Sequence, residues 1–574
     1  MIIESQLHFI EKIIEEDIKN GFSTKKIRFR FPPEPNGYLH IGHVKAIYLN
    51  FELGKKYNAP VNLRFDDTNP IGEKIKFIDS IKKDIKFLGF KWDQEYYASN
   101  YFQQLYEWAI ELIKNNKAYV DNLPKNIIQI QRKTPFESGI NSNYRNRSIN
   151  ENLYLFEKMK KGFFEEKTCV LRAKIDMSSS NMNMRDPIMY RILKKTHHRT
   201  KNKWCIYPTY DWTHGLCDYI EQISHSLCSL EFENRRPLYN WYLDQIVEKN
   251  KIRPKQIEFS RLNLNYSITS KRQIQFLINK KIIQSWKDPR ICTISGLRHR
   301  GYTAIAIKNF IQKIGISKRN NIIDISLLKF KIREHLNKIS TRVMVVLNPI
   351  KLIIDNYSSK KIEWVDAKNN PEDPKFGSRK IPFSKYLYIE KNDFLEKKRK
   401  EFFRLSIGCE VRLKNAYIIK ANSTIKNSNG EIIEVHCTYD PTSKSGKEKK
   451  SQTKRKIKST LHWVSIQHSI PIKIHIYKSL FLIKKIDKNF NKYINLKSTD
   501  KNFNKYINPK SIDKIIAYAE PFLHKAKKGD HFQFQRIGYF YVTTTNKYNK
   551  KLIFHKTVSI KDQWKKINDN NKKN

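Results

Sequence analysis

The chain contains few cysteines, and none of them stands in a metal-binding pattern. Its seven cysteines are scattered, without a Cys-x-x-Cys pair or a histidine at zinc-ligand spacing. We therefore expect reduced thiols, no metal site, and no tightly bound metal or organic cofactor. No uninterrupted apolar run approaches membrane-spanning length, and acidic residues interrupt the N-terminal apolar stretches where a signal peptide would lie. These absences predict a soluble, cytoplasmic protein without a membrane partner.

Two common nucleotide-binding motifs are also absent. No GxGxxG follows a predicted strand, and no GxxxxGK[ST] occurs. This disfavours dinucleotide and P-loop chemistry, so a nucleotide would have to be held by a different loop.

Acidic residues are scarce relative to basic ones. The 56 Asp and Glu residues are set against 110 Lys and Arg residues, which gives a formal net charge of +54. Such an excess favours a polyanionic partner, bound through phosphate contacts and counterion release. Lys, Ile and Asn are abundant throughout, as expected of an AT-rich coding sequence, and we assign part of the excess to that bias. The charge supports a nucleic-acid partner without proving one.

The most informative segment is FPPEPNGYLHIGH at Phe31–His43. His40 and His43 are followed at once by the apolar-periodic segment Val44–Phe51. This layout predicts a loop at the start of a helix, where free backbone N–H groups and the helix dipole attract phosphate. Taken alone, the segment is equally well explained as a Pro-rich turn with two surface histidines, because short motifs often occur by chance.

The flanking pattern predicts a βαβ unit around this loop. Lys26–Phe31 reads as a strand, the helix after the loop ends near Gly54, and Pro60–Phe65 reads as the next strand. Strand, loop, helix and strand in this order form the core of a doubly wound nucleotide-binding fold. After Thr341 the sequence changes to short β-rich runs separated by turns, which predicts two barrels.

The segment resembles the HIGH signature of class I aminoacyl-tRNA synthetases, in the form PPEPNGYLHIGH used by glutaminyl-tRNA synthetases. Further segments match that family in order: LRFDDTNP (Leu63–Pro70), LRAKIDM (Leu171–Met177), NKWCIYPTYDWTH (Asn202–His214), HSLCSLEF (His225–Phe232), EFSRLN (Glu258–Asn263), SKR (Ser270–Arg272) and DPRICTISGLRHRGYT (Asp288–Thr303). The similarity continues more thinly to about residue 565. The ordered set resembles the bacterial type of the family, from an AT-rich reduced genome.

The resemblance implies a multidomain α/β protein. It has a Rossmann-like catalytic domain with an acceptor-end insertion, a helical subdomain, and two C-terminal antiparallel β-barrels that bind the anticodon. The implied divisions are 1–100 with 211–261 for the catalytic domain, 101–210 for the insertion, 262–340 for the helical subdomain, 341–400 with 476–574 for the proximal barrel, and 401–475 for the distal barrel.

The resemblance also implies the reaction and its partners. L-Glutamine would be activated by ATP, which arrives as its Mg²⁺ complex, to glutaminyl-adenylate with loss of pyrophosphate. The glutaminyl group would then pass to the 2′-hydroxyl of the terminal adenosine of glutamine tRNA, releasing AMP. The resemblance also implies that the protein is a monomer.

By the same resemblance, the catalytic residues are His40, His43 and Lys271. The ATP-binding residues are Glu34, Pro35, Asn36, His40, Ile41, Gly42, His43, Val44, Lys45, Ala46, Ser229, Arg261, Leu262, Thr269, Ser270 and Lys271. The glutamine-binding residues are Arg30, Asp66, Tyr210, His214 and Cys228. The anticodon-reading residues are Arg342, Arg404, Arg412, Lys414, Gln533 and Arg536.

Several positions depart from the family pattern. Thr269 replaces a Met beside the predicted catalytic lysine, and Asn234 and Pro237 replace an Asp and an Arg at acceptor-stem positions. Lys414 replaces an Arg, which keeps the charge but loses the bidentate fork, so we expect relaxed base readout there.

Four other classes of protein share some of these features. Glutamyl-tRNA synthetases of the archaeal and eukaryotic type share much of the signature but place an Arg where this chain has Cys228. A neutral thiol cannot pair with a buried carboxylate, which favours glutamine. A non-catalytic RNA-binding derivative would have lost the histidines or Lys271, a tRNA-modifying paralogue would lack the barrels, and an unrelated basic RNA binder would not need DDTNP or YPTYD.

Two further segments carry no catalytic prediction. The nine residues DKNFNKYIN at 487–495 recur unchanged at 500–508, which indicates a recent tandem duplication in a surface loop. Lys444–Lys458 is a Lys-rich loop that we expect to be solvated or to face RNA.

Overall fold

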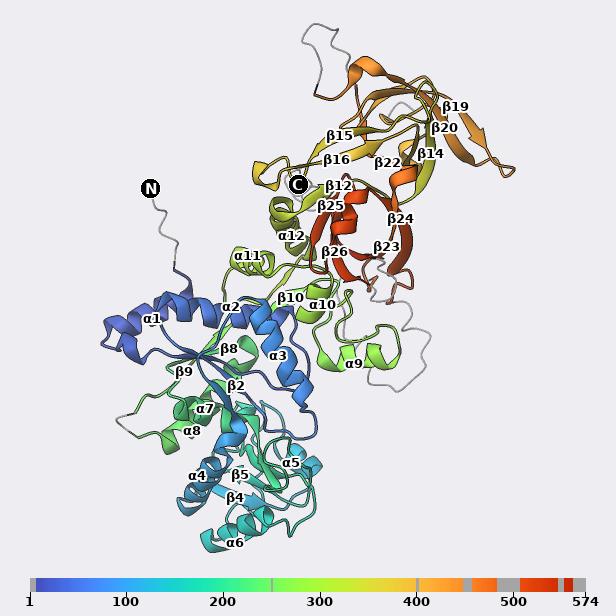
Figure 1. Ribbon diagram of the computed structural model, residues 1–574. Helices are drawn as coiled ribbons and strands as arrows, with labels where there is room; N and C mark the ends of the chain where they lie inside the picture. Colours follow the sequence, from blue (N-terminus) through green and yellow to red (C-terminus); the bar gives the residue numbers. More distant parts are fainter. Residues whose placement is uncertain are drawn as a thin grey trace.

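The computed structural model describes residues 7–248, 251–398, 402–446, 457–482, 506–545 and 552–560. The molecule is elongated, with the N-terminal half at one end and the C-terminal sheets at the other (Figure 1). The first copy of the tandem repeat, residues 500–505 of the second copy, and residues 447–456 of the Lys-rich loop lie outside the described residues. No helix in the described ranges is long and apolar enough to cross a bilayer.

The N-terminal half is organised around parallel strands. The strands are β1 (Phe29–Phe31), β2 (Val61–Phe65) and β3 (Glu95–Tyr97), paired in the order β1-β2-β3, and the parallel pair β8 (His225–Ser229) and β9 (Lys255–Phe259). The Ser224 N–H donates to the Arg28 carbonyl at 3.1 Å and so brings β8 beside β1. The associated helices are α1 (Phe9–Lys19), α2 (Ile41–Lys56) and α3 (Ile75–Phe87).

Burial explains this arrangement. All five residues of β2 are buried, as expected for a parallel strand covered on both faces. The apolar side of α2, including Ile41, Val44 and Ile47, packs into the same core. β1, α2 and β2 form the predicted βαβ unit, which confirms the Rossmann-like fold.

The insertion has its own core. It contains α4 (Phe102–Lys114), α5 (Lys125–Gln131), α6 (Ile149–Lys160) and the antiparallel strands β4 (Ala118–Asp121), β5 (Val170–Ala173), β6 (Ile188–Ile192) and β7 (Ile206–Pro208). Two later helices, α7 (Tyr210–Ile220) and α8 (Arg236–Ile246), bury Trp212 and Tyr242 in this core. α7 therefore joins the insertion to the parallel strands.

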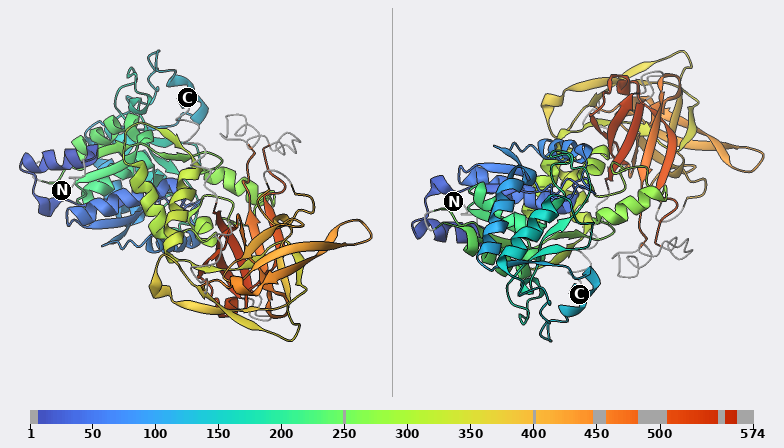
Figure 2. Two further views of the ribbon diagram at one scale, coloured as in Figure 1. Left: turned by 90° about the horizontal axis from the view of Figure 1, so that it is seen from above. Right: turned by 90° about the horizontal axis from the view of Figure 1, so that it is seen from below.

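A mainly helical segment links the two halves of the molecule (Figure 1). It consists of β10 (Leu262–Leu264), α9 (Lys271–Asn279), α10 (Ile294–His299), α11 (Ala304–Ile314), β11 (Asn321–Ile323) and α12 (Ile325–Ile339). Viewed from above and from below, the C-terminal sheets lie together at one end, away from the N-terminus (Figure 2).

The C-terminal part forms two curled seven-stranded sheets. The proximal sheet contains β12 (Thr341–Val343), β13 (Val345–Val346), β23 (Ile470–Tyr477), β24 (Ile512–Ala519), β25 (His531–Phe534), β26 (Gly538–Thr545) and β27 (Leu552–Ser559). The distal sheet contains β14 (Pro349–Ile354), β17 (Tyr386–Glu390), β18 (Glu410–Leu413), β19 (Ile418–Lys426), β20 (Ile432–Asp440), β21 (Thr460–Leu461) and β22 (Val464–Ser465). β15 (Glu363–Lys368) and β16 (Ser378–Phe383) form a separate hairpin.

Strand pairing differs from the sequence-based division of the barrels. Residues 341–400 were predicted to join 476–574 in the proximal barrel, but β14 pairs with β17 and β20 in the distal sheet. Only β12 and β13 of that segment enter the proximal sheet, and β23 joins it from residue 470 onward. Which strand pairs with which depends on contacts between residues distant in sequence. The alternation of side chains within one strand does not specify its partner.

Candidate active site

A cavity of about 600 Å³ opens where β1, β2, β8 and β9 end. This is the usual ligand position in an open α/β sheet, outside the carboxyl ends of the strands. Predicted site residues from widely separated segments line it. They are Glu34, His40, Gly42, His43, Ala46, Asp66, Tyr210, His214, Cys228, Ser229, Arg261 and Lys271.

His40 and His43 cap the start of α2 reciprocally. His40 Nδ1 accepts the Gly42 N–H at 3.1 Å, and His43 Nδ1 accepts the His40 N–H at 3.1 Å. Burial and nearby cations hold the pKa of His40 well below its usual value and lower the pKa of His43 to about 3. Both rings are therefore neutral with the proton on Nε2, so each offers one N–H donor.

Gly42 lies directly beneath the His40 ring. A Cβ atom at Gly42 would lie 2.8 Å from Cε1 of His40, so a larger residue would displace the ring. A Cβ atom at Gly37 would lie 2.9 Å from Cδ of Lys271, so a larger residue there would shift the lysine side chain.

Lys271 reaches the histidine loop from the first turn of α9. Its Nζ donates to Oδ1 of Asn36 and, at 3.4 Å, to the carbonyl of Glu34. Burial lowers the pKa of this ammonium, while Glu34 opposes that shift. The cation thus lies on the same side of the cavity as the histidine N–H donors, where their combined field favours an anion.

The remaining predicted nucleotide and amino-acid residues surround the cavity without lining it. They are Arg30, Pro35, Asn36, Ile41, Val44, Lys45, Leu262, Thr269 and Ser270. Lys45 is buried, and its Nζ donates to the Ser260 carbonyl at 2.7 Å and the Ser260 hydroxyl at 2.8 Å. In this structure Lys45 therefore ties α2 to the segment after β9.

Asp66 presents a carboxylate oxygen to the cavity. Oδ1 accepts from Nε of Arg64 at 3.0 Å, whereas the buried Oδ2 has no hydrogen-bond partner among the described residues. Burial raises the pKa of this carboxyl, and Arg64 opposes the rise. A buried acceptor without a partner is costly, so Oδ2 suits a ligand that brings a cationic donor.

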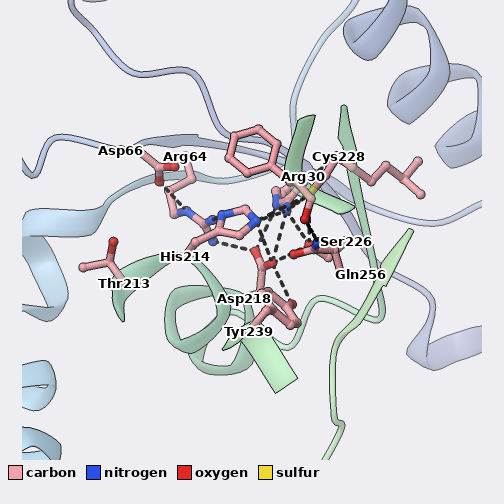
Figure 3. A network of polar contacts seen from close by, with 12 residues as sticks. Arg30, Arg64, Asp66, Thr213, His214, Asp218, Ser226, Cys228, Tyr239 and Gln256 are labelled. Carbon is pink, nitrogen blue, oxygen red and sulfur yellow. Dashed lines mark hydrogen bonds and ion pairs between the residues drawn. The ribbon is translucent and has the colours of Figure 1, made fainter. Parts of the chain in front are cut away.

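Behind the cavity, two buried arginines converge on Asp218, as Figure 3 shows. Asp218 Oδ1 accepts from Arg30 Nε and from Arg64 Nη1, each at 2.9 Å. Ser226 and Tyr239 donate their hydroxyls to Oδ2 at 2.7 and 3.0 Å. Burial alone would raise the pKa of Asp218, but the two guanidiniums hold it below its usual range.

This network orients the neutral groups of the cavity wall. His214 Nε2 lies 3.2 Å from Arg30 Nη2 and 3.5 Å from Cys228 Sγ, and burial lowers the pKa of His214 to about 3. Burial also raises the pKa values of Cys228 and Tyr210, which keeps the thiol and the phenol protonated. Tyr210 stacks on His214 with ring centroids 4.8 Å apart. At this end of the cavity, His214, Cys228 and Tyr210 therefore offer polar but uncharged groups.

Arg64, Asp218 and Glu221 were missed by the sequence analysis. His214, Asp218 and Glu221 recur at nearly helical spacing on α7 and its C-terminal cap. A polar stripe on the buried face of an otherwise apolar helix was the available signal, since buried charges require partners.

One side-chain group has the composition of a metal site. Ligand atoms of Asp67, His197 and His198 lie within 4.8 Å of one another, the one such group found among the described residues. However, His197 Nδ1 accepts the N–H groups of Arg199 and Thr200 at 3.2 and 3.1 Å, so Nε2 carries the proton and donates to the Asp67 carbonyl at 2.9 Å. His197 then has no lone pair to offer a metal.

At the predicted acceptor-stem position, the Asn234 backbone carbonyl accepts hydrogen bonds from the side-chain amides of Asn181 and Asn183 at 2.8 and 3.0 Å. Pro237 lies in the first turn of α8, where the missing N–H has no helical partner to lose.

Four of the six predicted anticodon residues form two groups in the C-terminal half. Arg342 pairs with Glu372 at 3.0 Å, and Gln533 donates to the Tyr539 hydroxyl at 2.7 Å. The Tyr539 hydroxyl and Arg342 both donate to Oδ1 of Asn337 on α12, which links these residues. Arg404 and Arg536 share Asp393. Arg412 donates to the Ser443 carbonyl at 2.8 Å, and the Lys414 side chain is exposed.

The sequence was compared with known families and proteins. The model of the family "tRNA synthetases class I (E and Q), catalytic domain" matches residues 26–338, and two models of its anti-codon binding domain match residues 340–440 and 460–543. The glutamine–tRNA ligase of Buchnera aphidicola subsp. Schizaphis graminum is 50% identical over 560 residues, covering 97% of this chain and 98% of that protein.

Other relatives agree. The glutamine–tRNA ligase of Clostridium kluyveri is 45% identical over 563 residues, covering 97% of this chain and 98% of its own. A solved glutamate tRNA ligase of Elizabethkingia meningosepticum aligns at a TM-score of 0.41 and 17% identity, over 55% of this chain and 70% of that one, too distant to support a conclusion. The family matches together span both halves of the sequence, and the chain belongs to the class I glutamyl- and glutaminyl-tRNA synthetases.

Proposed function

We propose that the protein is a glutamine–tRNA ligase that uses the cavity described above for both steps of the reaction. ATP activates L-glutamine to glutaminyl-adenylate, and the glutaminyl group is then transferred to the 2′-hydroxyl of the terminal adenosine of glutamine tRNA. Pyrophosphate and AMP are released. The relatives' shared activity and the class I catalytic domain support this reaction.

For activation, the glutamine carboxylate attacks the α-phosphate of ATP, and the protein must stabilise the negative charge that develops. The neutral His40 and His43 rings offer Nε2–H donors beside the first turn of α2. Lys271 supplies a cation for the leaving phosphates, and its bond to Asn36 shows that α9 already reaches the loop. Mg²⁺ enters with the nucleotide.

The part of the cavity lined by Asp66, Tyr210, His214 and Cys228 favours glutamine as the substrate. Oδ2 of Asp66 is the acceptor for the substrate ammonium, because it is buried and lacks another partner among the described residues. The single observation that favours glutamine over glutamate is the buried, protonated Cys228 thiol. Arg30 behind it is already bound by Asp218, Ser226 and the Leu227 carbonyl. A glutamate carboxylate here would be desolvated without its own counter-charge.

For tRNA recognition, we assign anticodon reading to Arg342, Arg404, Arg412, Lys414, Gln533 and Arg536. Splayed anticodon bases suit such a site because their edges and faces are accessible. One chain carries both the cavity and these residues, so we propose that it acts as a monomer. Because charging of tRNA serves translation, we propose a cytoplasmic location.

The test is ATP–pyrophosphate exchange with glutamine or glutamate, each with and without glutamine tRNA. We expect exchange with glutamine and tRNA together, and none above background with glutamate. Exchange that depends on glutamate would contradict the assignment. Aminoacylation with a 2′-deoxy terminal adenosine should be abolished, whereas a 3′-deoxy terminal adenosine should still be charged.

A further inference from the structure

Asp393 lies at the junction between the two C-terminal sheets. It ends the single 3₁₀ turn Lys391–Asp393 that follows β17 of the distal sheet. Its carbonyl accepts the Leu405 N–H at 3.1 Å, and its side chain is only 2% exposed. The backbone contact fixes the turn against the segment that carries Arg404.

Two predicted anticodon arginines converge on this carboxylate, Arg536 from the turn between β25 and β26 of the proximal sheet and Arg404 from the segment between β17 and β18 of the distal sheet. Arg536 makes a two-point contact, with Nη2 at 2.9 Å from Oδ1 and Nη1 on Oδ2. Arg404 Nη1 lies 2.8 Å from Oδ1. The arginine side chains remain 32% and 41% exposed, so both can still reach a ligand.

The backbone of Arg536 supports the same geometry. This residue lies in the turn between β25 and β26 with a φ of +67°, a left-handed conformation that is uncommon for residues other than glycine, asparagine or aspartate. Its Nη1 also lies 3.3 Å from His462 Nδ1, and His462 Nε2 lies 3.5 Å from Glu390. Two side chains from the distal part, Asp393 and His462, therefore hold the Arg536 side chain above its strained backbone, as is common where a backbone outlier serves a function.

We propose that Asp393 is a positioning residue for anticodon recognition, which holds Arg404 and Arg536 at the spacing and orientation needed to bind splayed bases. This inference rests on the proposed function. The carboxylate cancels the repulsion between the two guanidiniums and still leaves a net positive charge toward the RNA. It also holds both arginine side chains in place before tRNA arrives, so that they lose less conformational entropy on binding.

The competing explanation is that the same contacts only join the two sheets. A joining role predicts loss of fold stability, with equal losses for cognate tRNA and for anticodon variants. A positioning role predicts that discrimination between anticodons falls as well. The two roles are therefore separable by kinetics with variant tRNAs.

The experiment is aminoacylation by Asp393→Asn with cognate tRNA and with a tRNA changed at one anticodon base. We expect the KM for cognate tRNA to rise about 10- to 100-fold, as for loss of a bidentate base contact. kcat at saturating tRNA should change less than about threefold, and discrimination between the tRNAs should fall. Asp366→Asn is the matched control, because it removes an exposed carboxylate that pairs with Lys380 on the β15–β16 hairpin.

Asp393→Glu tests the proposal independently of folding. It keeps the charge but moves it by one methylene, so its KM and discrimination should lie between those of the wild type and Asp393→Asn. The proposal would be overturned if Asp393→Glu kept the wild-type KM and discrimination while Asp393→Asn failed to fold.

A double-mutant cycle separates this proposal from the proposed function. In an Arg404→Ala/Arg536→Ala background, Asp393→Asn should raise KM no further than about twofold, because the groups it positions are gone. Full additivity would overturn the positioning role. If the arginine variants raise KM but Asp393→Asn does not, the proposal fails and the function stands. If the arginine variants leave KM and discrimination unchanged, the anticodon assignment itself fails, and the proposal with it.

Discussion

Replacing Asp218 by asparagine should destabilise the catalytic half more than any comparable change of a surface carboxylate. The wild-type carboxylate accepts two hydrogen bonds from Arg30, one from Arg64, and one each from the Ser226 and Tyr239 hydroxyls. All three charged side chains are fully buried. An asparagine amide would direct N–H groups toward these donors and leave Arg30 without a carboxylate.

The size of the effect follows from burial. Breaking a buried ion pair by removing one partner costs about 3–5 kcal/mol. For a domain of 150–250 residues, each kcal/mol corresponds to about 2–4 °C in Tm, so Asp218→Asn should lower the first thermal transition by about 6–20 °C. The KM for glutamine should rise too, since Arg30 orients His214 and Cys228 at the cavity wall.

The pH dependence of stability provides a second test of the ion pairs of Asp218. Because the folded-state pKa of Asp218 lies below the unfolded value, its contribution is fully present above about pH 3.9 and is lost as the pH falls further. The difference between wild type and Asp218→Asn should be constant from pH 6 to 8 and should shrink in acid. Calorimetry and near-UV circular dichroism across this range are the assays.

Two controls sharpen the test. Asp244→Asn removes an exposed ion pair with Arg253 on nearby α8 and should cost less than about 1 kcal/mol. Glu221→Gln should cost less than Asp218→Asn, because the Glu221 carboxylate pairs with Arg64 Nη1 at 3.4 Å without a hydrogen bond among the described residues, and burial raises its pKa to about 7. The reasoning is refuted if Asp218→Asn melts within 2 °C of the wild type, or if Glu221→Gln is equally harmful.

Two further predictions concern the cavity and the loop beside it. His43→Ala and Lys271→Ala should each lower the rate of ATP–pyrophosphate exchange by about 10²- to 10³-fold while changing tRNA affinity less than threefold, and equal losses in both assays would contradict the roles assigned to them. Glu73 is buried beside Asp67, and burial raises its pKa to about 9. The folded state therefore keeps a proton that the unfolded chain loses above about pH 4.5, so stability falls as pH rises from about 4.5 toward 9. Glu73→Gln should flatten the pH dependence of unfolding free energy between pH 5 and 8, and an unchanged slope would show that Glu73 is ionised in the fold.

Local elements were predictable because their signals are local. The proline-stiffened approach, the two histidines and the following apolar periodicity predicted a loop and a helix, observed with α2 starting at Ile41. The strand predicted at Pro60–Phe65 is observed as β2. Each depends on side-chain period and capping residues, which are properties of neighbouring positions.

Placement of the site residues was predictable only through the family resemblance. That resemblance named residues on six separate segments which line one cavity, from Glu34 to Lys271. It did not reveal which predicted residues line the cavity and which, such as Arg30 and Lys45, lie behind the lining residues. The direction of a side chain depends on packing against elements hundreds of positions away.

The family, the βαβ unit, the thiol at position 228 and the excess of positive charge follow from the amino-acid sequence alone. The folded chain was needed to show that β14 and β17 belong to the distal sheet, that Arg30 and Arg64 share Asp218, and that Arg404 and Arg536 share Asp393. All three findings have the same cause. Strand pairing and buried charge compensation join groups far apart in sequence, so their free energy depends on which surfaces the fold brings together.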